Sequence, residues 1–441
     1  MQKLYLLLFL LLICIINTTI SANDFLNNPT YIKIKEINGF LDEDSYLDII
    51  RSSLFKQPEF RYAIAKASEQ EFNLKYAKRQ RFPSISGNII NDESIDRNIK
   101  DNQSVRKRRD DSFDATIEIK QPVYNGGKIN SAIRAAVSRT KGSVVGKRTT
   151  ISELILEANE IYLSTASINF ISNYAQNLLN ILKPYHSRVK DRVSSGIMDP
   201  VESALFFVRY SQLETLLYQL KSSAENYNKK YTLFFGNNPN NLTFPIINIE
   251  KSLINLNKKS YDVEVAEFNY EESKENIKNV RSDYLPSFGI SARYTKYDID
   301  DDSDEDDIRG GLYFSLPIFN FGRGAAQINS AKAASVGYKN AIDVAKKEDN
   351  VKESQILSNF NNAIDNRNNY LEAFNDTAKQ RKIIQERIDI SGFAANAFAE
   401  VTFNEINQLQ TLLNNEGVIL QGYMMIMHQN QQLINKLKIE F

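Results

Sequence analysis

Two pairs of short segments alternate apolar and polar residues with a period of two. The first pair spans about 82–91 and 112–121, and the second spans about 285–297 and 310–318. Such alternation predicts β-strands with one apolar and one polar face, and about ten residues in a tilted strand can cross a bilayer. The chain is therefore expected to contain two hairpins of membrane-length strands. In the clearest segment the polar residues, expected to face water, are Asp114, Thr116, Glu118 and Lys120.

Long stretches with very few glycines and prolines separate and follow the alternating segments. Apolar residues recur in these stretches at helical spacing, which predicts helices. A helix of about 68 residues would be on the order of 100 Å long, which favours a coiled-coil-like assembly over a globular domain. The polar segment 23–40 is expected to form an extended leader. The expected helices span about 41–80, 128–195, 200–235, 256–283, 323–403 and 405–440.

This plan occurs twice, once in residues 41–240 and once in residues 241–441. In each copy a short motif joins the second strand to the following long helix. The motif is a proline, a branched apolar residue, an aromatic residue, an asparagine, any residue, a glycine and a base. Proline interrupts strand pairing, and asparagine and glycine suit a tight turn. The motif residues expected to be structural are Pro122, Asn125, Gly127 and Lys128 in the first copy and Pro317, Asn320, Gly322 and Arg323 in the second.

The N-terminal residues have the pattern of a secretory signal peptide. Lys3 precedes an apolar run, and Ser21 and Ala22 provide small residues for cleavage, so residues 1–22 are expected to be removed. A retained anchor is the alternative. The only cysteine, Cys14, lies in this segment, so the rest of the chain has no thiol for disulfides, metal binding or nucleophilic catalysis. The 54 basic and 54 acidic residues balance, which gives no argument for a nucleic-acid partner.

Four membrane strands cannot close a barrel by themselves. An open sheet edge in lipid leaves backbone groups unpaired, and about eight strands are needed to enclose an interior. Several copies of the chain are therefore expected to pool their hairpins. Three copies would supply about twelve strands, enough to leave a lumen, and the polar strand residues would line it. The sequence excludes one copy more firmly than it selects three.

The ordered, duplicated features resemble the TolC-type outer-membrane channel family of bacterial export systems. The resemblance rests on the Phe82-Pro83-Ser84 and Leu285-Pro286-Ser287 strand starts, the two strand-to-helix motifs and two helical turns at matching positions. It implies a mainly α-helical fold with membrane β-strands, in which a homotrimer forms a twelve-stranded outer-membrane barrel continued by a periplasmic α-helical tunnel. It also implies a passive exit duct for efflux or type I secretion, without enzymatic activity.

The resemblance further implies partners. Members of this family work with a periplasmic adaptor protein and an inner-membrane pump or ABC transporter, and they contact outer-membrane lipid. An exported coiled-coil structural or adaptor protein without a pore is the alternative function. The strand pairs discriminate between the two functions, because an adaptor has no need of membrane-length segments that alternate apolar and polar residues.

In this family a glycine, a small hydroxyl residue and an acid mark each helical turn at the periplasmic tip, and the acids contribute to the gate. Glu202 is a gate residue or the end of a helix-capping box, and the two roles are compatible. At the second turn Gln410 replaces the acid, which puts the family's cation-binding ring in doubt. The matching residues are Gly196, Asp199 and Glu202 at the first turn and Asn404, Asn407 and Gln410 at the second.

Other candidate chemistry is weak. The acidic segment 298–307 lacks the glycine and the final glutamate of a calcium loop, so a solvated outer loop is the better interpretation. The basic run 106–109 lies at the equivalent place in the first hairpin and is solvated, touches lipid phosphates or meets the acidic loop. His186 and His428 are isolated from paired acids. The sequence therefore predicts no catalytic, cofactor or metal site.

Overall fold

The computed structural model describes residues 28–93, 95, 111–249, 259–300, 305–391 and 394–440. The expected signal peptide, Cys14 and the basic run 106–109 lie outside the described residues. The chain divides into two compact units, which we describe separately. The first unit contains the parts of Met1–Ala63, Arg148–Tyr261 and Glu348–Phe441 that are described, and the second contains those of Ile64–Lys147 and Asp262–Lys347.

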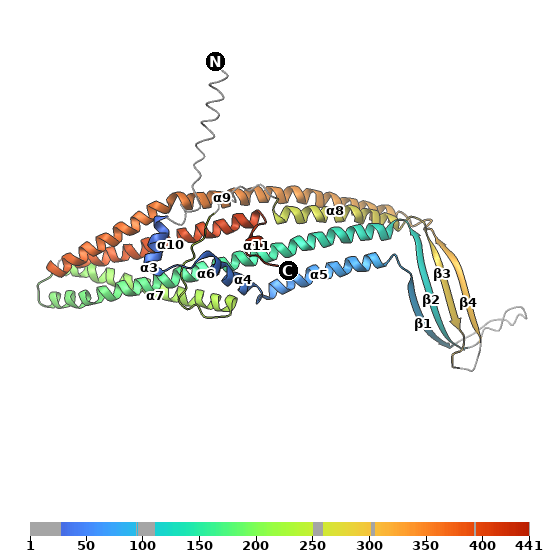
Figure 1. Cartoon of the computed structure of the whole chain (residues 1–441), viewed down its shortest axis with the longest axis horizontal. Coiled ribbons are helices and arrows are strands. Elements are labelled where there is room, and N and C mark those ends of the chain that lie inside the picture. Colours follow the sequence, from blue (N-terminus) through green and yellow to red (C-terminus); the bar gives the residue numbers. More distant parts are fainter. Residues whose placement is uncertain are drawn as a thin grey trace, which may run out of the picture. The chain divides into compact units, whose positions relative to one another are not determined.

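A four-stranded antiparallel sheet forms part of the second unit. Its strands are β1 (Ser84–Glu93), β2 (Asp111–Asn125), β3 (Ser287–Lys296) and β4 (Asp306–Ser315), and they lie side by side in chain order (Figure 1). The two hairpins predicted from the alternating pattern are therefore present. Two bounds differ most from expectation. β2 continues past Pro122 through an irregular register between Pro122 and Tyr124, and β4 begins at Asp306, inside the segment expected to be loop.

Four helical segments form the rest of the second unit. They belong to α5 (Pro58–Arg79), α6 (Lys128–Ser194), α8 (Tyr261–Ser282) and α9 (Arg323–Ser391). Thr140 of α6 donates to the Gln70 carbonyl of α5 at 3.1 Å. Arg134 of α6 pairs with Glu275 of α8 at 2.7 Å, and the Ser273 hydroxyl of α8 donates to Ser335 of α9 at 2.9 Å. The helices thus follow one another in the same order as the strands to which they connect.

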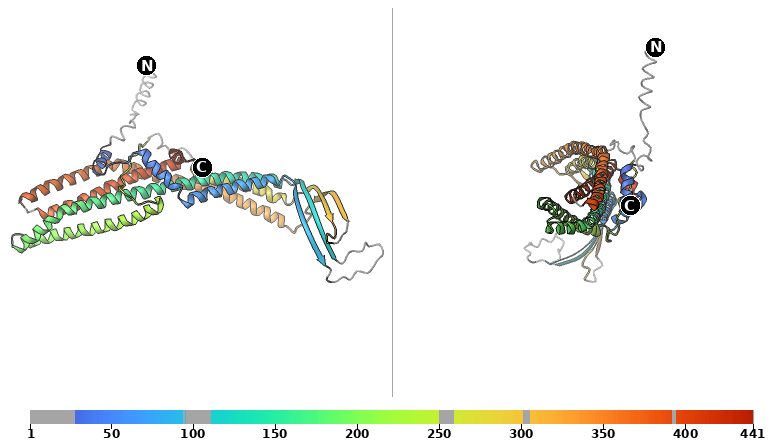
Figure 2. Two further views of the ribbon diagram at one scale, coloured as in Figure 1. Left: turned by 60° about the horizontal axis from the view of Figure 1, so that its bottom comes forward. Right: turned by 90° about the vertical axis from the view of Figure 1, so that its left-hand side faces the viewer.

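The first unit is a helical bundle with a small helical collar. Its long members are the remaining parts of α6 and α9 together with α7 (Pro200–Phe235) and α10 (Ala395–Gln429), which run alongside one another in Figure 2. The collar consists of α3 (Pro29–Asn38), α4 (Glu43–Leu54) and α11 (Leu433–Lys436). Helix α10 supplies a continuous buried stripe: Phe398, Ile406, Leu409, Leu413, Leu420 and Met427.

Three expectations about the helices were wrong. The segment expected to be an extended leader contains α3, because the Asn28 side chain accepts from the Thr30 amide and Pro29 opens the first turn. The stretch 41–80 is two helices, since Pro58 begins a new one. The helix expected to reach residue 403 ends at Ser391, and α10 has begun by Ala395.

None of the described helices combines the length and the apolar character needed to span a membrane.

Candidate functional site

The sheet has one apolar and one polar face, and cross-strand register keeps them separate over all four strands. On the apolar face Ile119 lies opposite Ile85 on one side and Ala292 on the other, and Ala292 lies opposite Gly310. Residues directly opposite in an antiparallel pair share a face. The apolar face is therefore a single surface, and it leaves Leu312 84% and Ile308 78% exposed in the single chain.

Aromatic residues end the apolar face where the strands meet the helices. Tyr124, Phe288 and Phe314 form one cross-strand row, and the rings of Tyr124 and Phe288 stack with centroids 5.6 Å apart. Just beyond β4, Phe319 and Phe321 pack edge to face at 4.7 Å, and both are largely exposed. The joint end of the apolar face is therefore bordered by aromatic rings.

The opposite face is mainly polar, although it also carries Ile90 of β1 and Tyr313 of β4. The four residues expected to face water (Asp114, Thr116, Glu118 and Lys120) lie on this face of β2. Thr116 contacts Thr295 of β3 at 3.3 Å between hydroxyl oxygens, and Lys120 donates to Glu118 at 2.7 Å. Glu118 lies opposite Ser86 of β1 and Arg293 of β3. The structure therefore brings the predicted polar residues together and adds arginines and serines from neighbouring strands.

The two strand-to-helix joints have the same geometry. The Asn125 carboxamide oxygen accepts from the Ile129 amide at 3.4 Å, and the Asn320 oxygen accepts from the Gly324 amide at the same distance. The Gly127 and Gly322 carbonyls accept from the amides of Ser131 and Ala326 at 3.0 and 3.1 Å. Each asparagine thus satisfies a backbone donor of the first helical turn that would otherwise lack a partner.

Two successive left-handed residues turn the backbone at each joint. Gly126 and Gly127 have φ of +63° and +85°, and Phe321 and Gly322 have +49° and +80°. A β-carbon on Gly126 would lie 2.7 Å from Leu285 Cβ, whereas one on Gly127 or Gly322 would meet nothing within 4 Å. The glycine that the motif specifies therefore supplies backbone freedom, while Gly126, at the position that the motif left unspecified, also permits close packing.

The bases that close the two motifs have different surroundings. Lys128 Nζ lies 2.6 Å from Asp283 Oδ1, next to the start of β3. Arg323 opens α9 and is exposed. Pro122 remains within β2, whereas Pro317 lies beyond the end of β4. The duplicated motif therefore gives equivalent turns at the two joints, but the bases and prolines around them are not equivalent.

The first helical turn lies where the sequence predicted it. Helix α6 ends at Ser194, Gly196 has φ +69°, and the Ile197 amide donates back to the Arg192 carbonyl at 2.9 Å. Asp199 caps α7 by accepting from the Val201 amide at 2.6 Å. The Glu202 carboxylate, in the first turn of α7, accepts no hydrogen bond among the described residues. The capping role thus belongs to Asp199.

The second helical turn is not at Asn404. Asn404, Asn407 and Gln410 lie inside α10, with Asn404 exposed and the other two partly buried. The buried stripe of α10 continues through this region from Phe398 to Leu409, so the helix has no reason to end there. These three residues are therefore not tip residues. Helix α9 ends directly before Gly392 in the sequence, which is the break signal that the motif comparison overlooked.

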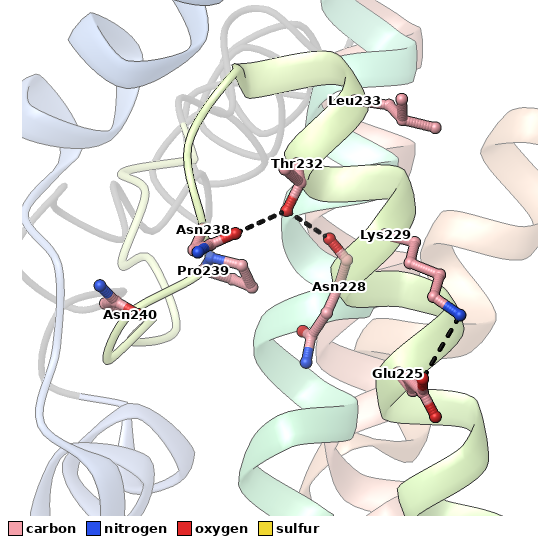
Figure 3. A pocket seen from close by; sticks show the side chains of 8 residues that line it. All are labelled: Glu225, Asn228, Lys229, Thr232, Leu233, Asn238, Pro239 and Asn240. Atoms are coloured by element: carbon pink, nitrogen blue, oxygen red, sulfur yellow. Dashed lines mark hydrogen bonds and ion pairs between the residues drawn. The ribbon is translucent and has the colours of Figure 1, made fainter.

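A shallow pocket occurs at the end of α7. Figure 3 shows Leu233 and Lys229 on the helix and Asn238 to Asn240 on the following turn. Lys229 pairs with Glu225 at 3.3 Å, and Thr232 donates to the Asn228 carbonyl at 2.9 Å. Among the described residues, no three histidines, cysteines or acids are grouped so as to hold a metal ion.

Comparisons with known proteins agree with this geometry. Residues 254–398 match the model of a family described as outer membrane efflux protein. The CmeC outer membrane channel of Campylobacter jejuni superposes with a TM-score of 0.75 at 16% identity, over 95% of this chain and 89% of that chain. The outer membrane protein VceC of Vibrio cholerae gives 0.63 at 16% identity, over 89% and 96% of the two chains. None of the curated protein sequences matches this chain.

This chain has the fold of the outer-membrane channels. The resemblance inferred from the duplicated motifs is thereby confirmed, and so is the expected combination of long helices with two β-hairpins. The open-state MtrE outer membrane channel of Neisseria gonorrhoeae shares the fold at a TM-score of 0.55 and 15% identity, over 89% of this chain and 88% of that chain.

Within this channel fold, two buried acids of α10 link helices in a way that the sequence did not predict. Glu405 accepts from Arg381 of α9 at 2.5 Å and from the Tyr174 hydroxyl of α6. Glu416 accepts two hydrogen bonds from Arg367 of α9. Both acids are fully buried. The sequence did contain an indication of their burial, because Glu405 and Glu416 occupy positions of α10 that continue its apolar stripe.

The Glu416 pair also reaches the collar. The Arg367 guanidinium lies 4.3 Å from the ring centroid of Tyr31 in α3, a cation–π contact. Burial raises the pKa of Glu416, and Arg367 only partly offsets this effect. Burial also raises the pKa of the Tyr31 hydroxyl. A buried, charged cluster thus links α3 to α9 and α10.

Proposed function

We propose that this chain is one subunit of a homotrimeric exit duct in the bacterial outer membrane. The observation that carries the proposal is the sheet with two chemically opposite faces. Leu312, Ile308 and their neighbours expose an apolar surface that water would disfavour, while the reverse face carries hydroxyls and charges. In a barrel wall the first face contacts lipid and the second lines a water-filled lumen.

The edges of the sheet support assembly from several copies. Within the described residues, neither β1 nor β4 has a partner strand on its outer side. Backbone groups at such an edge cannot remain unpaired in lipid. Pairing β4 of one copy with β1 of the next satisfies both edges, and three copies give about twelve strands, enough to leave a lumen.

The long helices supply the periplasmic continuation in this proposal. The duplicated joints turn the chain from each hairpin directly into α6 and α9, which have 67 and 69 residues. Three copies would surround the lumen with helices and form a tunnel below the barrel. Transport is passive, from an inner-membrane pump or ABC transporter with its periplasmic adaptor to the outside. The match to the outer membrane efflux protein family supports these partners.

We also propose that Glu202 contributes to closure of the periplasmic end. Its carboxylate lies in the first turn of α7, next to the turn at Gly196. No described residue forms a hydrogen bond or ion pair with this carboxylate. Three copies would bring three such carboxylates around the tunnel axis, where a divalent cation could bridge them. Because Asn404, Asn407 and Gln410 lie inside a helix, they are no part of this gate.

The alternative, an exported coiled-coil structural or adaptor protein, is less compatible with the sheet. Such a protein would have to bury the apolar face against another protein, whereas a lipid contact requires no dedicated partner. Expression in a Gram-negative host followed by membrane fractionation distinguishes the two. The duct predicts outer-membrane trimers whose gel mobility changes on heating and which open channels in planar bilayers. A soluble periplasmic monomer would overturn the proposal.

A further inference from the structure

Two arginines lie directly opposite each other on the polar face of the sheet. Arg293 of β3 pairs in register with Arg309 of β4. Side chains at opposite positions have β-carbons about 5 Å apart, and like charges there destabilise the pair. Sheet stability therefore does not account for this arrangement.

The surrounding carboxylates are already engaged. Arg309 Nε donates to Asp307 Oδ2 at 2.5 Å. Glu118 lies opposite Arg293 on the other side, but Lys120 Nζ donates to its carboxylate at 2.7 Å. Arg293 is exposed and makes no hydrogen bond or ion pair with any described residue. Its guanidinium therefore keeps all of its donors available to a solute.

Charge also changes sign along this face. Near the joints it carries three cations, Lys120, Arg293 and Arg309, and the two carboxylates paired with them are Glu118 and Asp307, which leaves Arg293 as the excess charge. Toward the loops it carries carboxylates, with Asp114 accepting from the Asp298 amide at 3.2 Å. The cations thus form a band across three neighbouring strands, and three copies of the chain would repeat that band around the lumen.

We infer that Arg293 and Arg309 form an anion-selective band in the lumen, which transiently binds solutes bearing carboxylate or phosphate groups. The inference rests on the proposed duct, because it requires the polar face to line the pore. A guanidinium presents paired N–H donors that match the two oxygens of such groups. Low-dielectric barrel walls strengthen the field of fixed charges inside a narrow aqueous passage.

A single cysteine introduced near the band can report the local electrostatic potential through its rates of reaction with charged reagents. Ser291 precedes Arg293 by two residues, so it lies on the same face of β3. The test protein carries Ser291→Cys together with Cys14→Ser, which leaves one thiol in the sequence. Outer-membrane vesicles containing the trimer are treated with an anionic methanethiosulfonate (sulfonatoethyl) or a cationic one (trimethylammonium-ethyl), and the two modification rates are compared.

The anionic reagent is expected to react faster. Adding Arg293→Gln and Arg309→Gln should lower the ratio of anionic to cationic rates by at least about threefold at low salt, and 1 M salt should reduce that difference. Arg293→Lys keeps the charge and should retain most of the ratio. Lys339→Gln removes an exposed charge from α9, outside the sheet, and should leave the ratio unchanged.

The outcomes separate the band from the duct. If neither reagent reaches the thiol in correctly assembled trimers, the polar face does not line an open lumen, and both the duct and the band are wrong. If both reagents react and neutralising the two arginines leaves the ratio unchanged, the anion-selective band is wrong while the duct stands. Heat-modifiable trimers in every variant establish that the rates refer to folded protein.

Discussion

Arg367 and Glu416 form a two-point ion pair in the core of the helical bundle, with Nε–Oε1 at 2.7 Å and Nη2–Oε2 at 2.6 Å. Their side chains are 3% and 0% exposed. A buried pair of this kind adds little stability relative to apolar residues, but removing one partner leaves an uncompensated charge. The pair therefore matters most for keeping α9, α10 and α3 in one arrangement.

Glu416→Gln is expected to lower the free energy of unfolding by about 3–5 kcal/mol, because Arg367 stays buried without its counter-charge. Denaturant unfolding followed by circular dichroism measures the effect. Glu225→Gln is the matched control, since its pair with Lys229 is exposed and should contribute less than about 1 kcal/mol. Equal effects of the two substitutions would contradict the importance assigned to burial.

Leu312→Arg is expected to prevent stable insertion of the sheet, at a cost of about 2–4 kcal/mol for each copy, because it places a charge on the lipid face. Gly311→Arg introduces the same side chain one residue away on the polar face and should assemble normally. The yield of heat-modifiable trimers in outer-membrane fractions measures both. Comparable yields would mean that the assigned faces are wrong.

Gly126→Ala is expected to be more damaging than Gly127→Ala. Both residues have positive φ, so each alanine incurs backbone strain of about 1–2 kcal/mol. Only at position 126 would the added carbon also lie 2.7 Å from Leu285 Cβ and 2.8 Å from the Ser282 carbonyl oxygen. Trimer yield and thermal midpoint should rank wild type above Gly127→Ala and that variant above Gly126→Ala. The reverse order would show that the joint is not packed as described.

Glu275 predicts a pH-dependent contribution to stability. Burial raises the pKa of this carboxyl, but hydrogen bonds and charge from Lys278 and Arg134 outweigh it and lower the pKa below its ordinary value. The stabilisation is therefore present above the unfolded-state pKa and is lost as pH falls through the folded-state pKa. Glu275→Gln should lower the thermal midpoint at neutral pH, and the difference should shrink on acidification. Glu71→Gln, at an exposed position of α5, is the control substitution.

Glu202→Gln tests the proposed periplasmic gate. If three Glu202 carboxylates hold a divalent cation, neutralising them should weaken block by Mg²⁺ or Ca²⁺ and raise single-channel conductance in planar bilayers. Asp199→Asn is a suitable control because it retains an oxygen for the cap of α7. Unchanged currents and unchanged divalent block in Glu202→Gln would remove Glu202 from the gate.

The sequence predicted the features that depend on neighbouring residues. Period-two alternation located both hairpins, and the asparagine and glycine of each motif correctly indicated a capped, left-handed turn. The N-cap at Asp199 followed from the same local chemistry. Strands, turns and helix caps that depend only on residues close in sequence were therefore predictable, including the roles of individual side chains.

Errors arose where distant parts of the chain decide the structure. The contact of Gly126 with Leu285 joins the two repeats, and no local pattern in either repeat indicates it. Glu405 and Glu416 occupy positions of the apolar stripe, but the arginines that compensate them can be identified only from the way α9 packs against α10. The second turn was placed by motif matching at Asn404, although the apolar stripe of α10 passes through that position without interruption.

The spacing of aromatic residues along the apolar face bears on the membrane thickness that would suit the proposed barrel. Along β3, the row containing Phe288 and the level of Tyr294 are separated by six residues, or about 20 Å at about 3.3 Å per residue. Tilting the strands shortens this height further. If rings at both levels sit at the interfaces, the hydrocarbon layer between them is thinner than the roughly 30 Å of an average bilayer. In the proposed barrel this spacing would suit the thin hydrocarbon layer of a bacterial outer membrane.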